Sequence, residues 1–225
     1  MKPIHLSVLF SDIKGYTGLS KKLEPQVLKE LLDSYLQCMS EIIEANEGTI
    51  DKVMGDGIIA LFGAPNPVEN HELKSVRAAV AMQAAVNELA DNWQAKGGNL
   101  IIRIGIASGD VIAGDLEVGD HEAFTALGDE VNLASRLEAK AKPGTILVSA
   151  STHSAIASVA HSNAVKNLEL KGFPDAVTAY EILALNESDD GNGGTAGWTA
   201  GMGSPDEMRI SPRKSLSIDV TFIGA

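Results

Sequence analysis

The sequence VLFSDIKGYT, residues 8–17, decides how the first part of the chain folds. Its apolar run is typical of a buried strand, and the run ends at the carboxylate of Asp12. A Gly-aromatic-Thr turn follows at residues 15–17. Asp12 can cap a following helix, or it can be a ligand held on rigid backbone, and its possible partners elsewhere in the chain bear on that choice.

After this first strand, the sequence predicts further strands and long amphipathic helices. Glycines in MGDG, residues 54–57, suit the tight turn of a hairpin. The expected strands cover residues 6–10, 49–53, 58–62, 100–108, 111–113, 145–148, 165–170 and 178–183, and the expected helices cover residues 25–47, 69–96 and 129–140. This order predicts an α+β fold with a ferredoxin-like (split βαβ), mainly antiparallel sheet, helices on one face and a C-terminal extension.

Composition limits the classes of function. The chain has 225 residues, of which 44% are hydrophobic and 21% charged, as in soluble globular proteins. A net charge of −12 should repel nucleic acid and anionic membranes. No apolar run approaches the roughly 18 residues that span a bilayer, so we expect a cytoplasmic protein or the cytosolic part of a larger or membrane-anchored one. Composition changes after Leu185, which predicts one domain over residues 1–185 and a flexible Gly/Asp/Ser-rich linker and tail over residues 186–225.

Asp12 and Asp56 are the first candidates for chemistry. Asp56 lies at the tip of the predicted hairpin, which can be a direct neighbour of the first strand in such a sheet. Two convergent carboxylates suit Mg²⁺ or Mn²⁺, and two such ions allow in-line displacement at phosphorus. The alternative is an ordinary helix cap at Asp12 and an ordinary turn at Asp56.

The segment ALGDEVNLASRLEAK, residues 126–140, adds a second set of candidates. If Asp129 begins a helix, Asn132 and Arg136 are four residues apart and project from one face. An amide beside a guanidinium can hold a sugar and a phosphate, although a surface Asn and a solvated Arg give the same pattern. Lys52 interrupts an apolar strand just before the hairpin turn, as either a ligand-binding or a solvated residue.

The motifs FSDIKGYT, DKVMGDGIIALFGAP, FTALGDEVNLASRLE and LKGF together resemble the signatures of class III nucleotidyl cyclases. The resemblance covers residues 4–183. It implies conversion of ATP or GTP to the 3′,5′-cyclic monophosphate with release of pyrophosphate. The resemblance implies that Asp12, Asp56 and the carbonyl of Ile13 are metal ligands, and that Lys52 and Thr125 recognise the purine. It also implies that the backbone of Lys14, Gly15, Tyr16 and Thr17, together with Lys171, binds the phosphates. Two catalytic roles are implied as well, for Asn132 on the ribose and for Arg136 on the pentavalent phosphorus.

Substrate choice and assembly follow from the same resemblance. Lys52 can donate to the N1 acceptor of adenine and Thr125 can accept from its amine, which favours ATP, whereas guanine would favour an acidic residue at position 52. Thr125 is similar to a subgroup of cyanobacterial and mammalian soluble enzymes, several of which respond to bicarbonate, so bicarbonate activation is a hypothesis. The family's site forms between two domains, which implies a homodimer with shared active sites. The alternatives are a guanylate cyclase and a catalytically silent cyclase-like regulatory module.

Overall fold

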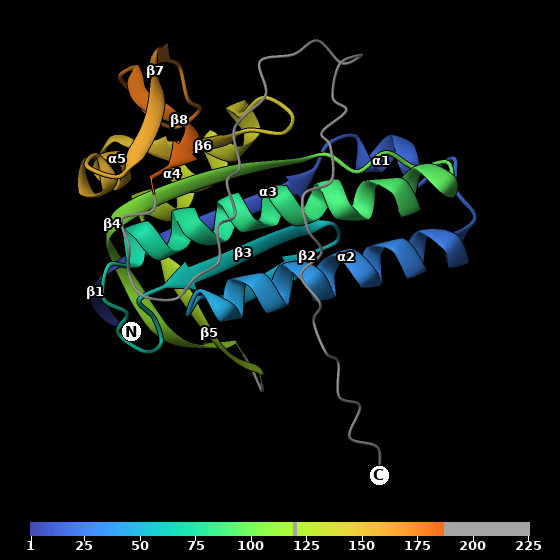
Figure 1. Ribbon diagram of the computed structural model, residues 1–225. Coiled ribbons are helices and arrows are strands. Elements are labelled where there is room, and N and C mark those ends of the chain that lie inside the picture. The colour runs from blue at the N-terminus through green and yellow to red at the C-terminus, as the bar shows by residue number, and fades with distance from the viewer. Residues whose placement is uncertain (119–120, 187–225) are drawn as a thin grey trace.

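A computed structural model describes residues 1–118 and 121–186 (Figure 1). Its elements in chain order are β1 (Lys2–Ile13), α1 (Tyr16–Leu19), α2 (Pro25–Ala45), β2 (Thr49–Met54), β3 (Gly57–Phe62), α3 (His71–Ala95), β4 (Ile102–Val118), β5 (His121–Leu127), α4 (Asp129–Lys140), β6 (Ile146–Ser149), α5 (Ala150–Ile156), β7 (Ala160–Leu168) and β8 (Val177–Leu185). The tail predicted over residues 186–225 lies almost wholly outside the described residues. None of the described helices is long and apolar enough to cross a membrane.

One sheet contains all the strands of the described residues, in the order β2-β3-β1-β4-β6-β8-β7, with β5 paired to the far half of β4. β1 lies between β3 and β4 and runs antiparallel to both, with Leu9 opposite Ala60 and Val8 opposite Ala107. The β4–β6 pair is parallel and the other strand pairs are antiparallel. The predicted α+β fold with a mainly antiparallel sheet is therefore confirmed.

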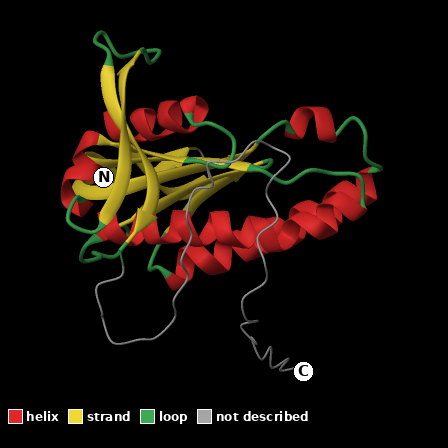
Figure 2. Ribbon diagram, turned by 45° about the horizontal axis from the view of Figure 1, so that its top comes forward, coloured by secondary structure: helices red, strands yellow, loops and turns green. Residues whose placement is uncertain are grey.

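Apolar side chains cover both faces of the central strands. Alternate residues of a strand point to opposite faces of the sheet, so neighbouring positions pack into different layers. Leu9 and Ile104 pack with α2 and α3 on one face, whereas Val8 and Ala107 pack with Ala134 of α4 on the other. α2 and α3 are the long helices expected on one face (Figures 1 and 2). α4 adds a layer to the second face, which the fully buried Val8 and Ala107 require.

The structure differs from the sequence prediction in β4. Residues 100–108 and 111–113 were expected to form two strands around a turn at Gly109-Asp110. Instead β4 is continuous, because Gly109 pairs with Leu6 and Asp110 with His5 in unbroken register along β1. β5 and α5 were not predicted, and α1 was considered only as a helix that Asp12 might cap.

Candidate active site

Antiparallel pairing brings Asp12 and Asp56 together. Ser11 of β1 lies opposite Ile58 of β3, so the turn that precedes β3 meets the end of β1. The backbone N–H of Ile13 donates to Asp56 Oδ2 at 3.2 Å, which fixes the second carboxylate beside the first. Gly55 allows the turn, since its φ of 65° is in the left-handed region that favours glycine. The predicted convergence of the two carboxylates is therefore present in this geometry.

The electrostatics of this pair favour a bound cation. Burial, and next the neighbouring carboxylate of Asp12, raise the pKa of Asp56 to about 6. Two carboxylates this close repel each other unless a proton or a cation lies between them. A divalent ion with oxygen ligands would provide that charge, and the carbonyl of Ile13 lies at the end of β1, next to Asp12.

Arg103 is a residue of this site that the sequence analysis missed. It lies directly opposite Asp12 in the β1–β4 pairing, and its Nη2 is 2.9 Å from Asp12 Oδ2 and 2.8 Å from Glu138 Oε1. Its Nη1 also donates to the carbonyl of Ala139 at 3.3 Å. The available signal was the same as for Lys52, namely one charged residue within the apolar strand sequence IIRIGIAS. Arg103 links the carboxylate pair to the end of α4.

The predicted phosphate loop begins directly after β1. Gly15 is in the left-handed conformation with φ 79°, and α1 starts at Tyr16. The amide of Lys14 donates to the carbonyl of Ile101 at 2.8 Å, so it is committed to the sheet and unavailable to a ligand. The contribution expected from the Lys14 amide is therefore wrong. The amides of the first helical turn, including those of Tyr16 and Thr17, have no partner within α1 itself.

Lys52 and Thr125 meet although 73 positions separate them in the sequence. Lys52 Nζ donates to Thr125 Oγ1 at 3.0 Å, and the Thr125 hydroxyl donates to Asp51 Oδ2 at 3.3 Å. The Asp51 side chain is only 3% exposed, and its burial raises its pKa. Asp51 is a second residue that the sequence analysis missed, and its signal was a second charge next to Lys52 in the strand TIDKVM.

Asn132 and Arg136 lie on α4, as predicted. Ala134 and Leu137 are buried on the side of this helix that packs against the sheet, while Asn132 is exposed and Arg136 half-buried. Among the described residues, neither Asn132 nor Arg136 forms a side-chain hydrogen bond with the carboxylate pair or with the Lys52–Thr125 pair. Asn132 and Arg136 are therefore available to other partners such as a ligand.

Gly105 of β4 sets how closely α4 approaches the sheet. A Cβ atom on Gly105 would lie 2.2 Å from the backbone nitrogen of Glu138 and 2.3 Å from the carbonyl oxygen of Ala134. The backbone of α4 thus rests directly on that of β4, which requires a residue without a side chain. This contact fixes the position from which Asn132 and Arg136 project.

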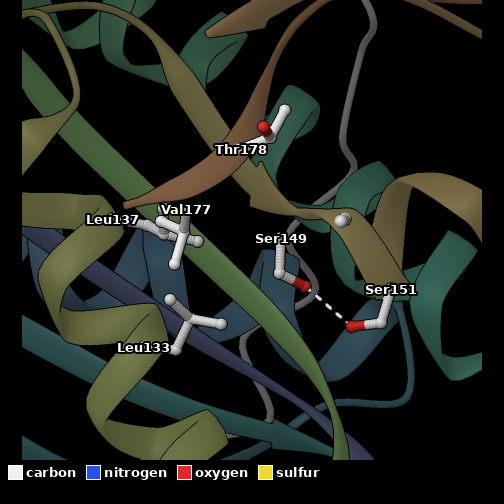
Figure 3. A pocket seen from close by; sticks show the side chains of 7 residues that line it. Leu133, Leu137, Ser149, Ser151, Val177 and Thr178 are labelled. Carbon is white, nitrogen blue, oxygen red and sulfur yellow. Dashed lines mark hydrogen bonds between the residues drawn. The ribbon is translucent and has the colours of Figure 1, made fainter. Parts of the chain in front are cut away.

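Lys171 and the pocket between α4, β8 and α5 lie apart from the carboxylates. Lys171 is exposed in the connection between β7 and β8, at the other end of the sheet order from the β2–β3 turn. A pocket of about 330 Å³ opens between α4, β8 and the start of α5 (Figure 3). It is lined by Leu133, Val177 and neighbouring residues and contains none of the predicted site residues.

Comparisons with known proteins show which family the chain belongs to. Residues 3–184 match the family described as the adenylate and guanylate cyclase catalytic domain. The adenylate cyclase of Anabaena cylindrica is 32% identical over 192 residues, which cover 80% of this chain and 37% of that protein. The chain thus spans little more than a third of that relative's length.

Solved structures are similar over most of the chain. The adenylyl cyclase CyaB from P. aeruginosa has a TM-score of 0.79 and 36% identity, covering 85% of this chain and 98% of that one. The guanylyl cyclase Cya2 has a TM-score of 0.79 and 31% identity, covering 84% and 96%. The chain belongs to the adenylate and guanylate cyclase catalytic domain family, the class III cyclases.

Proposed function

We propose that this domain is an adenylate cyclase that converts ATP to 3′,5′-cyclic AMP and pyrophosphate. A bond forms between the ribose 3′-oxygen and the α-phosphorus, and the bond from the α-phosphorus to the pyrophosphate oxygen breaks. The observation that carries the proposal is the meeting of Asp12 and Asp56 beside the Ile13 turn. It is joined by the similarity to proteins named as adenylate cyclases.

Asp12, Asp56 and the Ile13 carbonyl would hold two divalent ions, Mg²⁺ or Mn²⁺, per site. Their oxygens are hard ligands, carried by β1 and by the adjoining β2–β3 turn, and burial together with the neighbouring Asp12 carboxylate raises the pKa of Asp56. When bound, the ions neutralise developing charge on the phosphates and activate the attacking oxygen. The chain's own part is to place the carboxylates and, through the amides of Gly15, Tyr16 and Thr17, to receive the terminal phosphates.

Hydrogen bonding around Thr125 supports adenine as the base. Because the Thr125 hydroxyl donates to Asp51, its oxygen is left as an acceptor, while Lys52 can act only as a donor. Adenine presents an acceptor at N1 and a donor at its amine, which matches this pair, whereas guanine presents the reverse. Bicarbonate activation stays a hypothesis that rests on Thr125, and unchanged turnover across added bicarbonate would remove it.

Membership of the cyclase family, whose sites form between two domains, supports a homodimer with shared sites. One chain supplies Asp12 and Asp56, and the partner supplies Asn132 and Arg136 together with the purine pair. Lys171, far along the sheet order from Asp56, would reach the terminal phosphates from the partner. Asn132 would orient the ribose, and Arg136 would stabilise charge on the pentavalent phosphorus.

Product analysis tests the reaction. Purified protein is given ATP or GTP separately, with Mg²⁺ and then Mn²⁺, and the products are separated by chromatography. Cyclic AMP from ATP, absent in Asp12→Ala and in Asp56→Ala, is the expected result. Cyclic GMP instead would show that the account of Lys52 and Thr125 is wrong. No product from a protein shown to be dimeric would favour a silent regulatory module.

Mixing two inactive variants tests the shared site. Asp56→Ala and Arg136→Ala lie in different halves of the proposed site, so each homodimer is inactive. A heterodimer contains one intact site, and exchange of subunits should restore up to about a quarter of wild-type activity if chains pair at random. The matched control mixes Asp12→Ala with Asp56→Ala, which damages the same half and should restore nothing. No recovery in the first mixture, with exchange shown by a labelled subunit, would refute the shared site.

A further inference from the structure

A second cluster of ligand-type side chains lies near the start of β1. His5 of β1 and both His71 and Glu72 of the first turn of α3 each offer one ligating atom, and these atoms lie within 4.8 Å of one another. His5 and Asp12 are seven positions apart on β1, which is roughly 23 Å at about 3.3 Å per residue. The cluster is therefore distinct from the carboxylate pair.

The tautomer of His5 is set by Asp110 of β4. His5 Nδ1 lies 2.8 Å from Asp110 Oδ1, and because an ionised carboxylate only accepts, Nδ1 carries the proton. The lone pair of Nε2 then lies 3.8 Å from Glu72 Oε1. A lone pair facing a carboxylate oxygen is unfavourable unless a proton or a cation lies between them. A histidine that donates its other N–H to a carboxylate is the usual arrangement around a bound metal.

His71 is held on the buried side of the cluster. Its Nδ1 is 2.8 Å from Ser7 Oγ, which is itself 2.6 Å from Ser108 Oγ, so the ring is fixed against the sheet. The same Nδ1 is 3.6 Å from Glu72 Oε2. Burial lowers the pKa of His71, which keeps the ring neutral and able to ligate. The Glu72 carboxylate thus has one oxygen toward each imidazole.

We propose that His5, His71 and Glu72 form a second metal site, which takes a borderline transition-metal ion such as Zn²⁺ and completes its coordination with water. Two imidazoles and one carboxylate favour such an ion over Mg²⁺. Ligand atoms around a tetrahedral zinc ion with bonds of about 2.0–2.1 Å are about 3.3 Å apart. The ligating atoms, one from each residue, lie within 4.8 Å of one another, so the side chains must draw together to reach this spacing. His5, whose side chain is 56% exposed, can turn to close this gap.

Glu130 of α4 extends the cluster toward the helix that carries Asn132. A Cβ atom on Gly109 would lie 2.9 Å from Glu130 Cγ, so the side chain rests on β4 next to Asp110. Within the described part of the chain, Glu130 Oε2 is buried without a hydrogen-bond partner. Burial chiefly raises the pKa of Glu130, and the carboxylates of Asp129 and Asp110 add to the rise. A cation in the cluster would compensate this carboxylate and tie β1, α3 and α4 together.

Zinc titration against a chromophoric chelator of known affinity tests the site. The protein carries no polyhistidine tag, and Asp12→Asn with Asp56→Asn forms the background, so that the carboxylate pair does not compete for the ion. We expect one Zn²⁺ per chain. His5→Ala and Glu72→Gln should each weaken binding at least tenfold, and Asp110→Asn about tenfold through the orientation of His5. Co²⁺ should give the intense visible absorption of a tetrahedral site.

His161→Ala is the matched control, because His161 is also an exposed strand histidine with one hydrogen-bond partner, Asn186. It should bind Zn²⁺ as the background protein does. Equal affinity in His5→Ala and His161→Ala would overturn the proposal. So would the absence of Zn²⁺ binding in the background protein. Circular dichroism of each variant shows that the fold is retained.

Discussion

Gly105→Ala is the sharpest test of how the sheet positions the predicted catalytic residues. The added Cβ would lie 2.2 and 2.3 Å from backbone atoms of Glu138 and Ala134, whereas ordinary contacts begin at 3.4 Å. α4 must therefore retreat by about 1 Å, since backbone atoms cannot rotate away as a side chain can. Asn132 and Arg136 move with the helix, and a misplacement of about 1 Å can reduce turnover about 100-fold.

The same substitution also lowers stability, so the assay has to separate the two effects. Overpacking costs about 1–3 kcal/mol, which corresponds to roughly 2–12 °C in melting temperature for a domain of this size. Ile104→Val on the neighbouring position is the matched control. Ile104 is fully buried on the opposite face, so it loses about 0.5–1.5 kcal/mol without displacing α4.

The measurement is kcat at saturating nucleotide, well below the melting temperature of each variant. We expect Gly105→Ala to lose about 100-fold in kcat and Ile104→Val to keep near wild-type kcat. A folded Gly105→Ala protein with wild-type kcat would refute the reasoning, because it would show that α4 either does not move or does not carry catalytic groups.

Two further predictions concern the carboxylates. Asp51→Ala removes the acceptor of the Thr125 hydroxyl, so the preference for ATP over GTP in kcat/KM should fall about tenfold, near the contribution of one hydrogen bond; an unchanged ratio would show that Asp51 does not orient Thr125. Because the pKa of Asp56 is raised from 3.8 to about 6, ionisation of this group lowers the stability of the metal-free protein as pH rises through that interval. The melting temperature of Asp56→Asn should therefore exceed that of the wild type at pH values above about 6, and the difference should vanish near pH 4. Mg²⁺ should raise the melting temperature of the wild type more than that of the variant. A lower melting temperature for the variant above pH 6 would contradict this.

Local signals predicted the parts of the fold that have a strong pattern of their own. The hairpin of β2 and β3 follows from glycines around Asp56, and α4 begins at Asp129 and ends at Lys140 as its apolar period indicates. β5 was not predicted because its partner is the far half of β4, and no local pattern in residues 121–127 reveals that pairing. The continuity of β4 through Gly109 likewise depends on its register with β1.

Candidate site residues were likewise predictable only where their own segment of sequence carries a clear signal. Asp12 and Asp56 end or begin apolar strands, so each stands out in its own segment. Arg103 does not, because its role depends on lying opposite Asp12 across two strands and beside Glu138 of α4. Asp51 was hidden by its neighbour Lys52, and its function is visible only through the hydrogen bond from Thr125, 74 positions away.

Arg103 should be the main electrostatic support of this end of the sheet. Its side chain is 18% exposed, that of Glu138 is 12% exposed, and the guanidinium contacts both Glu138 and Asp12. Burial is the main reason that the pKa of Glu138 is raised from 4.5 to about 7, and Arg103 opposes that rise. Arg103→Met would leave both carboxylates without this partner. Breaking such a buried pair costs about 3–5 kcal/mol.

The pH dependence distinguishes this charge effect from simple loss of packing. Because the folded pKa of Glu138 lies above its usual value, stability is lost as pH rises from about 4.5 to 7, and the loss must grow once Arg103 no longer opposes it. The variant should therefore be destabilised much more at about pH 8 than at about pH 5.5, where Glu138 is protonated. Adding Glu138→Gln should recover a large part of the loss at the higher pH, as a double-mutant cycle would show. Equal destabilisation at both pH values would mean that Arg103 contributes through its packing rather than through its charge.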